Sequence, residues 1–551
     1  MTTIQRYINL LKLDKKDIYQ VIFYAIFAGI VSLSLPLGIQ AIINLIQGGR
    51  ISFSWILLIV LVIIGVALVG ILSLMQLRIT ENIQQKIFIR SSFEFAAKFP
   101  QIKPNEHYNN YPPDLANRFF DTINIQKGTS KILTDFSSAL LQIVFGILLL
   151  SIYHPFFIIF GFLLFILLYS IFRYSFLPGL NSSLQESKFK YKVASWIQEI
   201  ARNNVSFKRK HSNDFALHKN DELVMEYLGF RESHFAVLKR QFKQLILFKV
   251  IITAGLLSIG GYLVLQQQMN IGQFVAAEII ILMVLGSVEK IILGLETLYD
   301  VLTSVEKIGQ FTDLELEDKS SHVDKKACFN NLVLELKNVY FSFPDSNENI
   351  LKDISITINQ GDKIFVDGGN ASGKTTLIKI LSGLLNPSSG MFYVNDDTFK
   401  KIDLEQYRTQ IGTIVTGETP FEGTILENIT FNDPNISGEQ IKWVIEKVKL
   451  IDYIKSLPDG LDTKIFPEGQ QLSSSNAQKI VLARNIINKP KLLFFEDALD
   501  KMDEDITEEI IDFIMDSKDW SVIVSSKNKY WKTKAQRIIT VKKGKIISDT
   551  L

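Results

Sequence analysis

The strongest chemical signal in the chain is a loop that could hold phosphate groups. The segment GGNASGKTT begins at Gly368 and fits the pattern G-x-x-x-x-G-K-[ST], with Gly373, Lys374 and Thr375 at the fixed positions. The apolar run DKIFVDG precedes it as a strand and TLIKILSGLL follows it as a helix, which is the context that this pattern needs. In such a loop the backbone N–H groups at a helix N-terminus surround the phosphates.

The side chains of this loop predict a nucleotide and a metal ion. We expect Lys374 to reach the β- and γ-phosphates of ATP and the Thr375 hydroxyl to bind Mg²⁺. The predicted cofactors are therefore ATP and Mg²⁺. The predicted phosphate-binding residues are Gly368, Gly369, Asn370, Ala371, Ser372, Gly373, Lys374, Thr375 and Thr376.

A second candidate for chemistry is the segment LLFFEDALDKMD, which begins at Leu492. Its apolar residues read as a buried strand that runs into two acids, Glu496 and Asp497. Carboxylates are ligands that Mg²⁺ accepts and groups that can act as a general base, so these two acids are candidates for a metal site or for catalysis.

The composition shows that this chemistry belongs to a membrane protein. The chain has 551 residues, of which 47% are hydrophobic, and its formal net charge of +2 provides no basic field for nucleic acid. Six long apolar runs approach the ~20 residues that a helix needs to cross a bilayer. They begin at Ile18, Ile51, Ser137, Pro155, Leu245 and Phe274. They disfavour a soluble ATPase that merely attaches to a membrane.

The connecting segments predict the orientation of these spans. The segments after the second and fourth runs are long and rich in Lys and Arg, whereas the other turns are short and nearly uncharged. Basic segments stay on the cytoplasmic side, so both termini should be cytoplasmic and the chain should be a multi-pass protein of the cytoplasmic (inner or plasma) membrane. The amphipathic segment QRYINLLKLDKK before the first run predicts a helix at the membrane surface.

The sequence changes character after about residue 312. The charged stretch DLELEDKSSHVDKK reads as a linker, and strand-like and helical runs alternate beyond it. We expect a transmembrane domain at 1–312, a linker at 313–329 and a nucleotide-binding domain at 330–551. The fold class is then an α-helical transmembrane bundle of six spans followed by an α/β P-loop NTPase domain.

With these motifs in order, the chain resembles the ATP-binding-cassette (ABC) exporters, in the half-transporter arrangement of one membrane domain and one nucleotide-binding domain. VYFSFP resembles the loop that stacks an aromatic ring on adenine, which implies this role for Phe343. LSSSNAQKIVLARNII falls where the signature motif and its helix belong, which implies phosphate contacts from Ser473 and Ser475. LLFFED falls at Walker B, DKMD at the D-loop, and VIVSSKN at the strand before the switch histidine.

Five functional positions depart from the family pattern. The Q-loop glutamine, which resemblance implies as a metal-sensing residue, is Thr416. The signature LSGGQ is LSSSN, the Walker B acids are inverted as Glu496–Asp497, the D-loop SALD is DKMD, and the switch histidine is Lys527. The implied metal residues are thus Thr375, Thr416 and Glu496, and the implied catalytic residues are Asp497, Glu496 and Lys527 at degenerate positions.

The inverted acids predict weak hydrolysis. Glu496 carries one extra methylene and must retract to serve Mg²⁺, while Asp497 is short by the same amount, roughly 1.5 Å, as a base for water. A misplacement of about 1 Å can cost ~10²-fold in rate. Lys527 cannot accept and donate hydrogen bonds as a neutral imidazole does. Slow hydrolysis and nucleotide binding without useful turnover both remain open.

The resemblance implies a dimer in which each ATP site joins the Walker motifs of one chain to the signature of the other. Both kinds of defect lie on this chain, so either a homodimer or a heterodimer would have impaired sites. Implied partners are a second half-transporter, membrane lipid and a periplasmic adaptor protein, with no nucleic acid. The predicted function is ATP-dependent export, and the alternative is a non-hydrolysing ATP-binding subunit or regulator of a secretion assembly.

The sequence leaves the cargo open between a polypeptide, a lipid and a small hydrophobic molecule. The membrane half is closest in texture to the polypeptide secretion branch, called type I. Glu278 and Glu289 in the sixth run are candidates for the cargo path, because they are three helical turns apart on one face of a helix. Lys290 does not share that face.

Overall fold

The structure is a computed structural model that describes residues 2–48, 53–106, 110–317, 331–344, 346, 348–500 and 502–550. The chain forms two compact units: Met1–Ile102 with Asn110–Leu316, and Lys103–Asn109 with Glu317–Leu551. Most of the predicted linker at 313–329 lies outside the described residues, so the predicted domain boundaries stay predictions.

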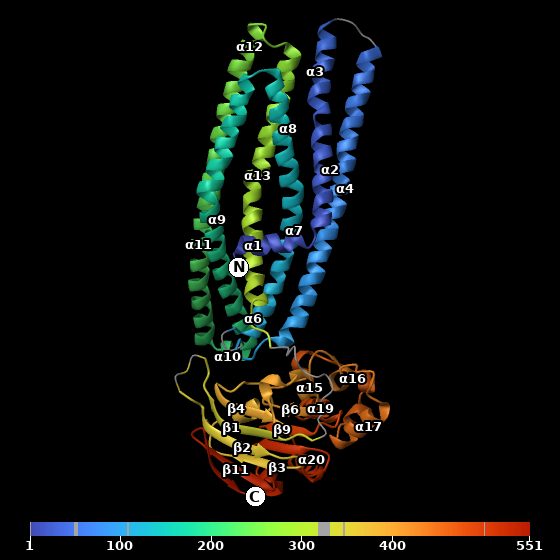
Figure 1. Ribbon diagram of the computed structural model, residues 1–551, viewed down its shortest axis with the longest axis vertical. Helices are drawn as coiled ribbons and strands as arrows, with labels where there is room; N and C mark the ends of the chain where they lie inside the picture. The colour runs from blue at the N-terminus through green and yellow to red at the C-terminus, as the bar shows by residue number, and fades with distance from the viewer. Residues whose placement is uncertain are drawn as a thin grey trace. The chain divides into compact units, whose positions relative to one another are not determined.

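The first unit is built from long helices (Figure 1). Six helical segments are long and apolar enough to cross a membrane, which confirms the predicted six-span bundle. These are Lys15–Gln47, Phe53–Gln101, Pro112–Tyr153, Phe156–Arg202, Lys210–Leu265 and Ile271–Thr312. Each contains all or nearly all of one predicted apolar run, and most extend well beyond it.

The helices of this unit are interrupted by short turns of other helix types. The first span is divided at Leu33 into α2 and α3, and π-helical turns interrupt the third and fifth spans. The elements are α1 Thr3–Lys12, α2 Lys15–Ser32, α3 Ser34–Gln47, α4 Phe53–Lys98, η1 Phe99–Gln101, α6 Pro112–Asn117, η2 Arg118–Phe120, α7 Asp121–Lys131, η3 Ile132–Phe136, α8 Ser137–Tyr153, α9 Phe156–Arg202, α10 Asn204–Phe207, α11 Lys210–Gly255, η4 Leu256–Gly260, α12 Gly261–Leu265 and α13 Ile271–Thr312.

Helix α1 runs across the long helices rather than along them (Figure 1). Thr2 and Gln5 form a capping box that starts it, so two backbone N–H groups of the first turn are satisfied. The guanidinium of Arg6 donates to both carboxylate oxygens of Asp313, at 2.8 and 2.5 Å, just past the end of α13. Ile4 and Ile8 remain exposed, so α1 has the two-sided character that its sequence predicts.

The second unit is an α/β domain with two main sheets. The larger sheet has the strand order β12-β11-β3-β10-β9-β6, and the smaller has the order β2-β1-β4-β5. The strands are β1 Leu334–Phe341, β2 Leu351–Ile358, β3 Lys363–Asp367, β4 Ser389–Val394, β5 Asp397–Thr398, β6 Ile411–Ile414, β7 Gly423–Thr424, β8 Lys464–Ile465, β9 Leu492–Glu496, β10 Ser521–Ser525, β11 Arg537–Lys542 and β12 Lys545–Thr550.

Helices cover the larger sheet and supply the remaining elements of this unit. They are α14 Lys374–Leu381, η5 Phe399–Lys401, α15 Leu404–Thr409, α16 Ile425–Thr430, α17 Gly438–Lys447, α18 Ile451–Ser456, η6 Gly460–Asp462, η7 Pro467–Gly469, α19 Ser474–Ile486, α20 Glu504–Asp516 and α21 Tyr530–Lys534. Together with the membrane helices, this domain confirms the predicted fold class.

The topology of the larger sheet decides where the candidate residues meet. Strand β10 pairs in parallel with β3 on one side and with β9 on the other, and β9 pairs in parallel with β6. Every residue of β9 and β10 is buried, so these strands form the centre of the domain. The carboxyl ends of parallel strands share one edge of a sheet, which is where ligands bind in open α/β folds.

Candidate nucleotide site

The loop between β3 and α14 has the backbone shape of a phosphate-binding loop. Gly368, Ala371 and Gly373 have φ values of +150°, +57° and +107°, and Gly373 caps α14. A Cβ atom on Gly368 would lie 2.3 Å from the Val541 carbonyl oxygen, so no other residue fits there. Nothing lies within 4 Å of the corresponding position on Gly369, so the space beside this glycine is open.

The polar groups of this loop fit an anionic ligand. Lys374 Nζ donates to the carbonyl oxygens of Gly368 and Gly369, at 2.8 and 2.9 Å, so its charge lies inside the loop. The Ser372 hydroxyl is buried and has no hydrogen-bond partner among the described residues. A buried hydroxyl of this kind is unfavourable until it meets an acceptor or donor, and a phosphate oxygen would supply one. Asn370 is exposed in the loop, and Thr376 is buried in the first turn of α14.

Glu496 contacts both of the other residues predicted to serve the metal, Thr375 and Thr416. One of its carboxylate oxygens accepts from the Thr375 hydroxyl at 2.6 Å, and the other accepts from the backbone N–H of Thr416 at 3.0 Å. The Thr416 hydroxyl donates to the Glu496 carbonyl oxygen at 3.1 Å. Burial alone would raise the pKa of Glu496, but the hydrogen bonds from Thr375 and Thr416 outweigh it and hold the pKa below its ordinary value. Glu496 is therefore a carboxylate at neutral pH.

Asp497 lies at the turn that follows β9, in a left-handed conformation with φ +44°. Its backbone N–H donates to the Ser525 carbonyl oxygen at 2.8 Å, which ties the end of β9 to the end of β10. Burial, followed by the charges of Glu496 and Asp500, raises the pKa of Asp497, while Lys527 and Lys374 oppose the rise. Lys527 is exposed, two residues beyond β10. The structure thus brings Asp497 and Lys527 to one edge of the sheet.

The signature segment LSSSN begins α19, as the resemblance implies. Ser473 is the N-cap residue, and its hydroxyl accepts from the Asn476 backbone N–H at 3.2 Å. Ser475 follows in the first turn of the helix. A cavity of about 330 Å³ lies beside this turn, and Thr416, Ser474 and Asp497 are among its lining residues. No hydrogen bond joins Ser473 or Ser475 to the phosphate loop within the described part of this single chain.

The predicted adenine contact, Phe343, lies two residues past the end of β1. Its ring packs edge-on against Phe341, with 5.1 Å between the ring centroids. It is partly buried against the apolar core that contains β1, β2 and α14. An aromatic face is thus available near the start of the domain, although residues 345 and 347 nearby lie outside the described residues.

Arg484 joins the signature helix to α16 and to the loop after β6, a role that sequence reasoning did not identify. Arg484 of α19 donates through Nε to the Asn428 carbonyl oxygen at 2.8 Å and through Nη2 to the Asn428 side chain at 2.7 Å. It also contacts Glu418, at 3.4 Å. Its guanidinium lies 5.2 and 5.3 Å from the ring centroids of Phe421 and Phe431. The Arg484 side chain is largely buried, with 11% of its surface exposed. Its role in linking these segments is visible only in the three-dimensional contacts.

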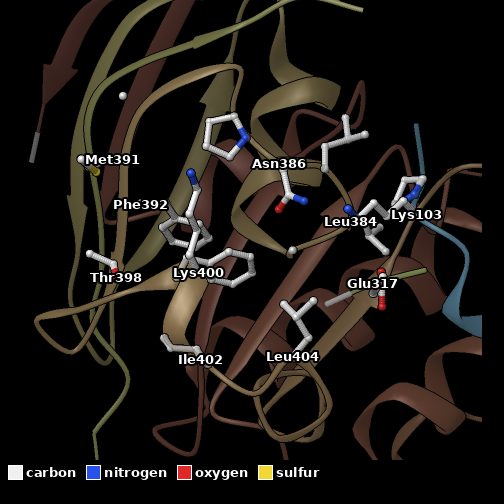
Figure 2. A pocket seen from close by; sticks show the side chains of 16 residues that line it. Lys103, Glu317, Leu384, Asn386, Met391, Phe392, Thr398, Lys400, Ile402 and Leu404 are labelled. Atoms are coloured by element: carbon white, nitrogen blue, oxygen red, sulfur yellow. The ribbon is translucent and has the colours of Figure 1, made fainter. Parts of the chain in front are cut away.

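A separate cavity of about 630 Å³ lies elsewhere in the second unit (Figure 2). Its lining combines the apolar side chains of Leu384, Phe392 and Leu404 with the polar ends of Asn386 and Lys400. None of the predicted nucleotide-binding residues belongs to the lining. This cavity is therefore distinct from the candidate nucleotide site.

Comparison with known proteins agrees with this geometry. Residues 351–500 match the family model described as ABC transporter. The ATP-dependent permease MDL1 of Candida albicans is 34% identical over 194 residues, which cover 35% of this chain and 28% of that protein. The alpha-hemolysin translocation ATP-binding protein HlyB of Escherichia coli O157:H7 is 30% identical over 326 residues, which cover 58% of this chain and 45% of that protein. These matches span less than half of each relative's length.

A solved structure extends the comparison to the whole fold. The structure of a bacterial Atm1-family ABC exporter with ATP bound superimposes with a TM-score of 0.84 over 97% of this chain and 95% of that one, at 15% sequence identity. At this identity the likeness shows the fold alone. The chain thus matches the ABC transporter family model over residues 351–500, and its six long apolar helices and its likeness to this structure give a multi-pass membrane protein with the fold of an ABC exporter.

Proposed function

We propose that this chain is an ATP-dependent exporter half-transporter that dimerises and moves cargo out of the cytoplasm, with impaired ATP hydrolysis. The observation that carries the proposal is the contact of Thr375 with Glu496, at 2.6 Å. This contact assembles the phosphate loop and the acid that would serve Mg²⁺, and the same chain carries six helices fit to span a membrane.

The residues of the site divide into two roles in ATP binding. Residues Gly368 to Thr376 would surround the phosphates, and Phe343 would stack on the adenine ring. Thr375 and Glu496 would hold Mg²⁺, and Thr416 supports Glu496 from the other side. ATP bound between two such domains would supply binding energy for their association.

The impairment of hydrolysis follows from the residues at the end of β9. Asp497 has a side chain one methylene shorter than the glutamate that resemblance implies for the attacking water, and a shortfall of about 1 Å can cost ~10²-fold in rate. Lys527 offers a permanent positive charge, which stabilises bound ATP but cannot relay a proton as imidazole does. Ser474 and Ser475 add Cβ atoms where the family has glycine.

Dimerisation completes the site in this proposal. Ser473 and Ser475 lie at the start of α19 without a hydrogen bond to the described phosphate loop of their own chain, so they are available to a partner's ATP. The partner is a second half-transporter, identical or different. The membrane orientation is the one that the basic segments predict, with both termini in the cytoplasm.

The cargo that fits best is a polypeptide. The name of HlyB states that it serves alpha-hemolysin translocation, and 58% of this chain aligns with it. A periplasmic adaptor protein is the corresponding additional partner. Surrounding lipid completes the set of partners.

A second candidate function is a non-hydrolysing ATP-binding subunit or regulator of a secretion assembly. The observation that favours it is that the switch position holds Lys527 while both oxygens of Glu496 already accept hydrogen bonds. In this case ATP binding alone would set the conformation of the membrane helices.

One experiment separates the two candidates. The purified protein is reconstituted in lipid nanodiscs, and binding of a fluorescent ATP analogue and release of phosphate are both measured. The exporter proposal predicts ATP binding and a slow release of phosphate, both lost in Lys374→Ala. Binding without any release that Lys374→Ala removes would select the second candidate. Absence of nucleotide binding would contradict both.

A further inference from the structure

Glu278 is a charged residue in a part of the membrane unit that is otherwise apolar. From Ile271 to Val288, α13 carries no other Asp, Glu, Lys or Arg. We count along each helical segment from the end beside the loops at 154–155 and 266–270. Apart from Glu278, the first charged residues met in this direction are Arg173 in α9, Lys249 in α11 and Glu289 in α13. Each lies about 17 residues, or roughly 25 Å, from that end. This depth approaches the ~30 Å of a bilayer's hydrocarbon core.

By the same measure, Glu278 lies inside that apolar layer. It is seven residues beyond Ile271, the first residue of α13, which places it roughly 10 Å along the helix axis. A carboxylate in hydrocarbon is strongly unfavourable, and acids in membrane helices face a partner or a water-filled space. The contacts of Glu278 therefore indicate whether it faces a partner or a water-filled space.

Within the first unit, Glu278 has no partner among the described residues. Its side chain is half-buried and neither a hydrogen bond nor an ion pair reaches it from the described part of the chain. Glu289 on the same helix is different, because Lys249 of α11 donates to it at 2.5 Å. Of the two predicted acids, Glu289 thus has an ion-pair partner, and Glu278 has none among the described residues.

Glu278 lies at the border between the packed and the open face of α13. The packed face, with Ala277, Ile281 and Val288, begins about 60–100° around the helix from Glu278 and is completely or almost completely buried against neighbouring helices. On the other side of Glu278, Leu282 and Leu293, one and four turns further along the helix, are 57% and 53% exposed. An acid flanked by exposed leucines forms a surface that matches an amphipathic molecule with a positive charge.

We propose that this face of α13 lines the cargo path and that Glu278 selects a cationic amphipathic segment of a polypeptide cargo. The inference rests on the proposed export function and specifies its substrate. Charge complementarity supports this occupant, because Lys249 already pairs with Glu289, whereas no basic side chain of the described residues contacts Glu278. Leu282 and Leu293 would contact the apolar side of the same segment.

The first test asks whether Glu278 faces water. Cys328 is the chain's single cysteine, so a Cys328→Ser background permits labelling at one chosen position. We expect Glu278→Cys and Leu282→Cys to react with a water-soluble, membrane-impermeant thiosulfonate in nanodiscs. Leu68→Cys is the control, because Leu68 is an exposed residue within the apolar run of α4. Labelling of Glu278→Cys no faster than that of Leu68→Cys would overturn the proposal.

The second test asks whether Glu278 recognises positive charge. The probes are a fluorescent peptide of alternating Leu and Lys blocks and a matched peptide with Glu in place of Lys. Glu278→Gln should weaken binding of the Lys peptide at least tenfold, and Glu278→Asp should retain most of it. Glu232→Gln removes an exposed acid of α11 and should leave binding unchanged. Equal affinity of wild type and Glu278→Gln for the Lys peptide would refute the assignment.

Binding of a fluorescent ATP analogue is measured on the same samples. If ATP binds but the Lys peptide does not bind wild type, the cargo assignment fails while the proposed function stands. If wild type does not bind ATP, the proposed function fails, and the labelling pattern still decides whether this face is wet. A contact of Glu278 with a second copy would appear as a Glu278→Cys disulfide crosslink without peptide binding, which also contradicts the assignment.

Discussion

Ser526 donates a 2.8 Å hydrogen bond to the carboxylate of Asp500. This bond joins the segment after β9 to the residue before Lys527, so two positions that depart from the ABC pattern are physically connected. Both substituted positions act on Asp497, because the charge of Asp500 raises the pKa of Asp497 and that of Lys527 lowers it. The substituted residues therefore form one local arrangement and should be altered together as well as singly.

The length of the Asp497 side chain can be tested directly. Asp497→Glu restores one methylene and should raise the rate of phosphate release by about tenfold or more, because a carboxylate within reach can activate water. Combination with Lys527→His should raise it further. The measurement is phosphate release at saturating ATP in nanodiscs, with Asp497→Asn as the control of equal size. An unchanged rate in Asp497→Glu and in the double variant would show that the length of the Asp497 side chain does not limit the rate of ATP hydrolysis.

Removal of the Thr375 hydroxyl should weaken the metal site selectively. Thr375→Val keeps the shape of the side chain but loses the 2.6 Å bond to Glu496 and the ligand for Mg²⁺. We expect the increase in ATP affinity caused by Mg²⁺ to fall about tenfold, while affinity measured with a chelator present changes little. Thr376→Val serves as the neighbouring control. Equal losses with and without Mg²⁺ would instead indicate a damaged loop.

Arg484 should contribute to the stability of the second unit through the shape of its guanidinium. Arg484→Lys keeps the charge but cannot make both bonds to Asn428, and it loses the planar contacts with Phe421 and Phe431. A loss of about 2 kcal/mol is expected for such charged hydrogen bonds. Thermal unfolding followed by tryptophan fluorescence reports it as a lower melting temperature. Arg408→Lys, at an ion pair with Glu317, provides a comparison at another site.

The buried Lys363 should give the domain a pH-dependent stability. Its ammonium donates to the carbonyl oxygens of Trp520 and Ile514, at 2.7 and 3.3 Å, and burial lowers its pKa from 10.5 to about 8. Between these two values the unfolded chain binds more protons than the folded one, so the free energy of unfolding rises with pH. Below pH 8 the penalty is complete.

Lys363→Met removes this linkage. The melting temperature of wild type, minus that of Lys363→Met, should increase as the pH rises from about 8 toward 10.5. Tryptophan fluorescence of both proteins in the same buffers measures it. Parallel curves for the two proteins would show that Lys363 does not titrate in this range.

Local patterns in the sequence predicted the elements, and tertiary contacts supplied the rest. The six spans follow from runs of apolar residues, and the phosphate loop follows from glycines and a lysine at fixed spacing, so both are readable along the chain. The bonds from Thr416 to Glu496 depend on the parallel register of β6 and β9, which no local pattern specifies. The pairing of Lys249 with Glu289 depends on how α11 and α13 are rotated against each other. Helical periodicity showed only that Glu289 would not pair with Lys290.

Arg6 donates two hydrogen bonds to the carboxylate of Asp313, so the first turn of α1 is tied to the C-terminal end of α13. The polypeptide continues from Asp313 toward the second unit, and a pull along it would load α1 as well as α13. Because Ile4 and Ile8 are exposed, α1 would resist such a load through apolar contacts with a membrane surface. The first dozen residues would thus oppose movement of the C-terminal end of α13, to a degree that depends on the surrounding bilayer.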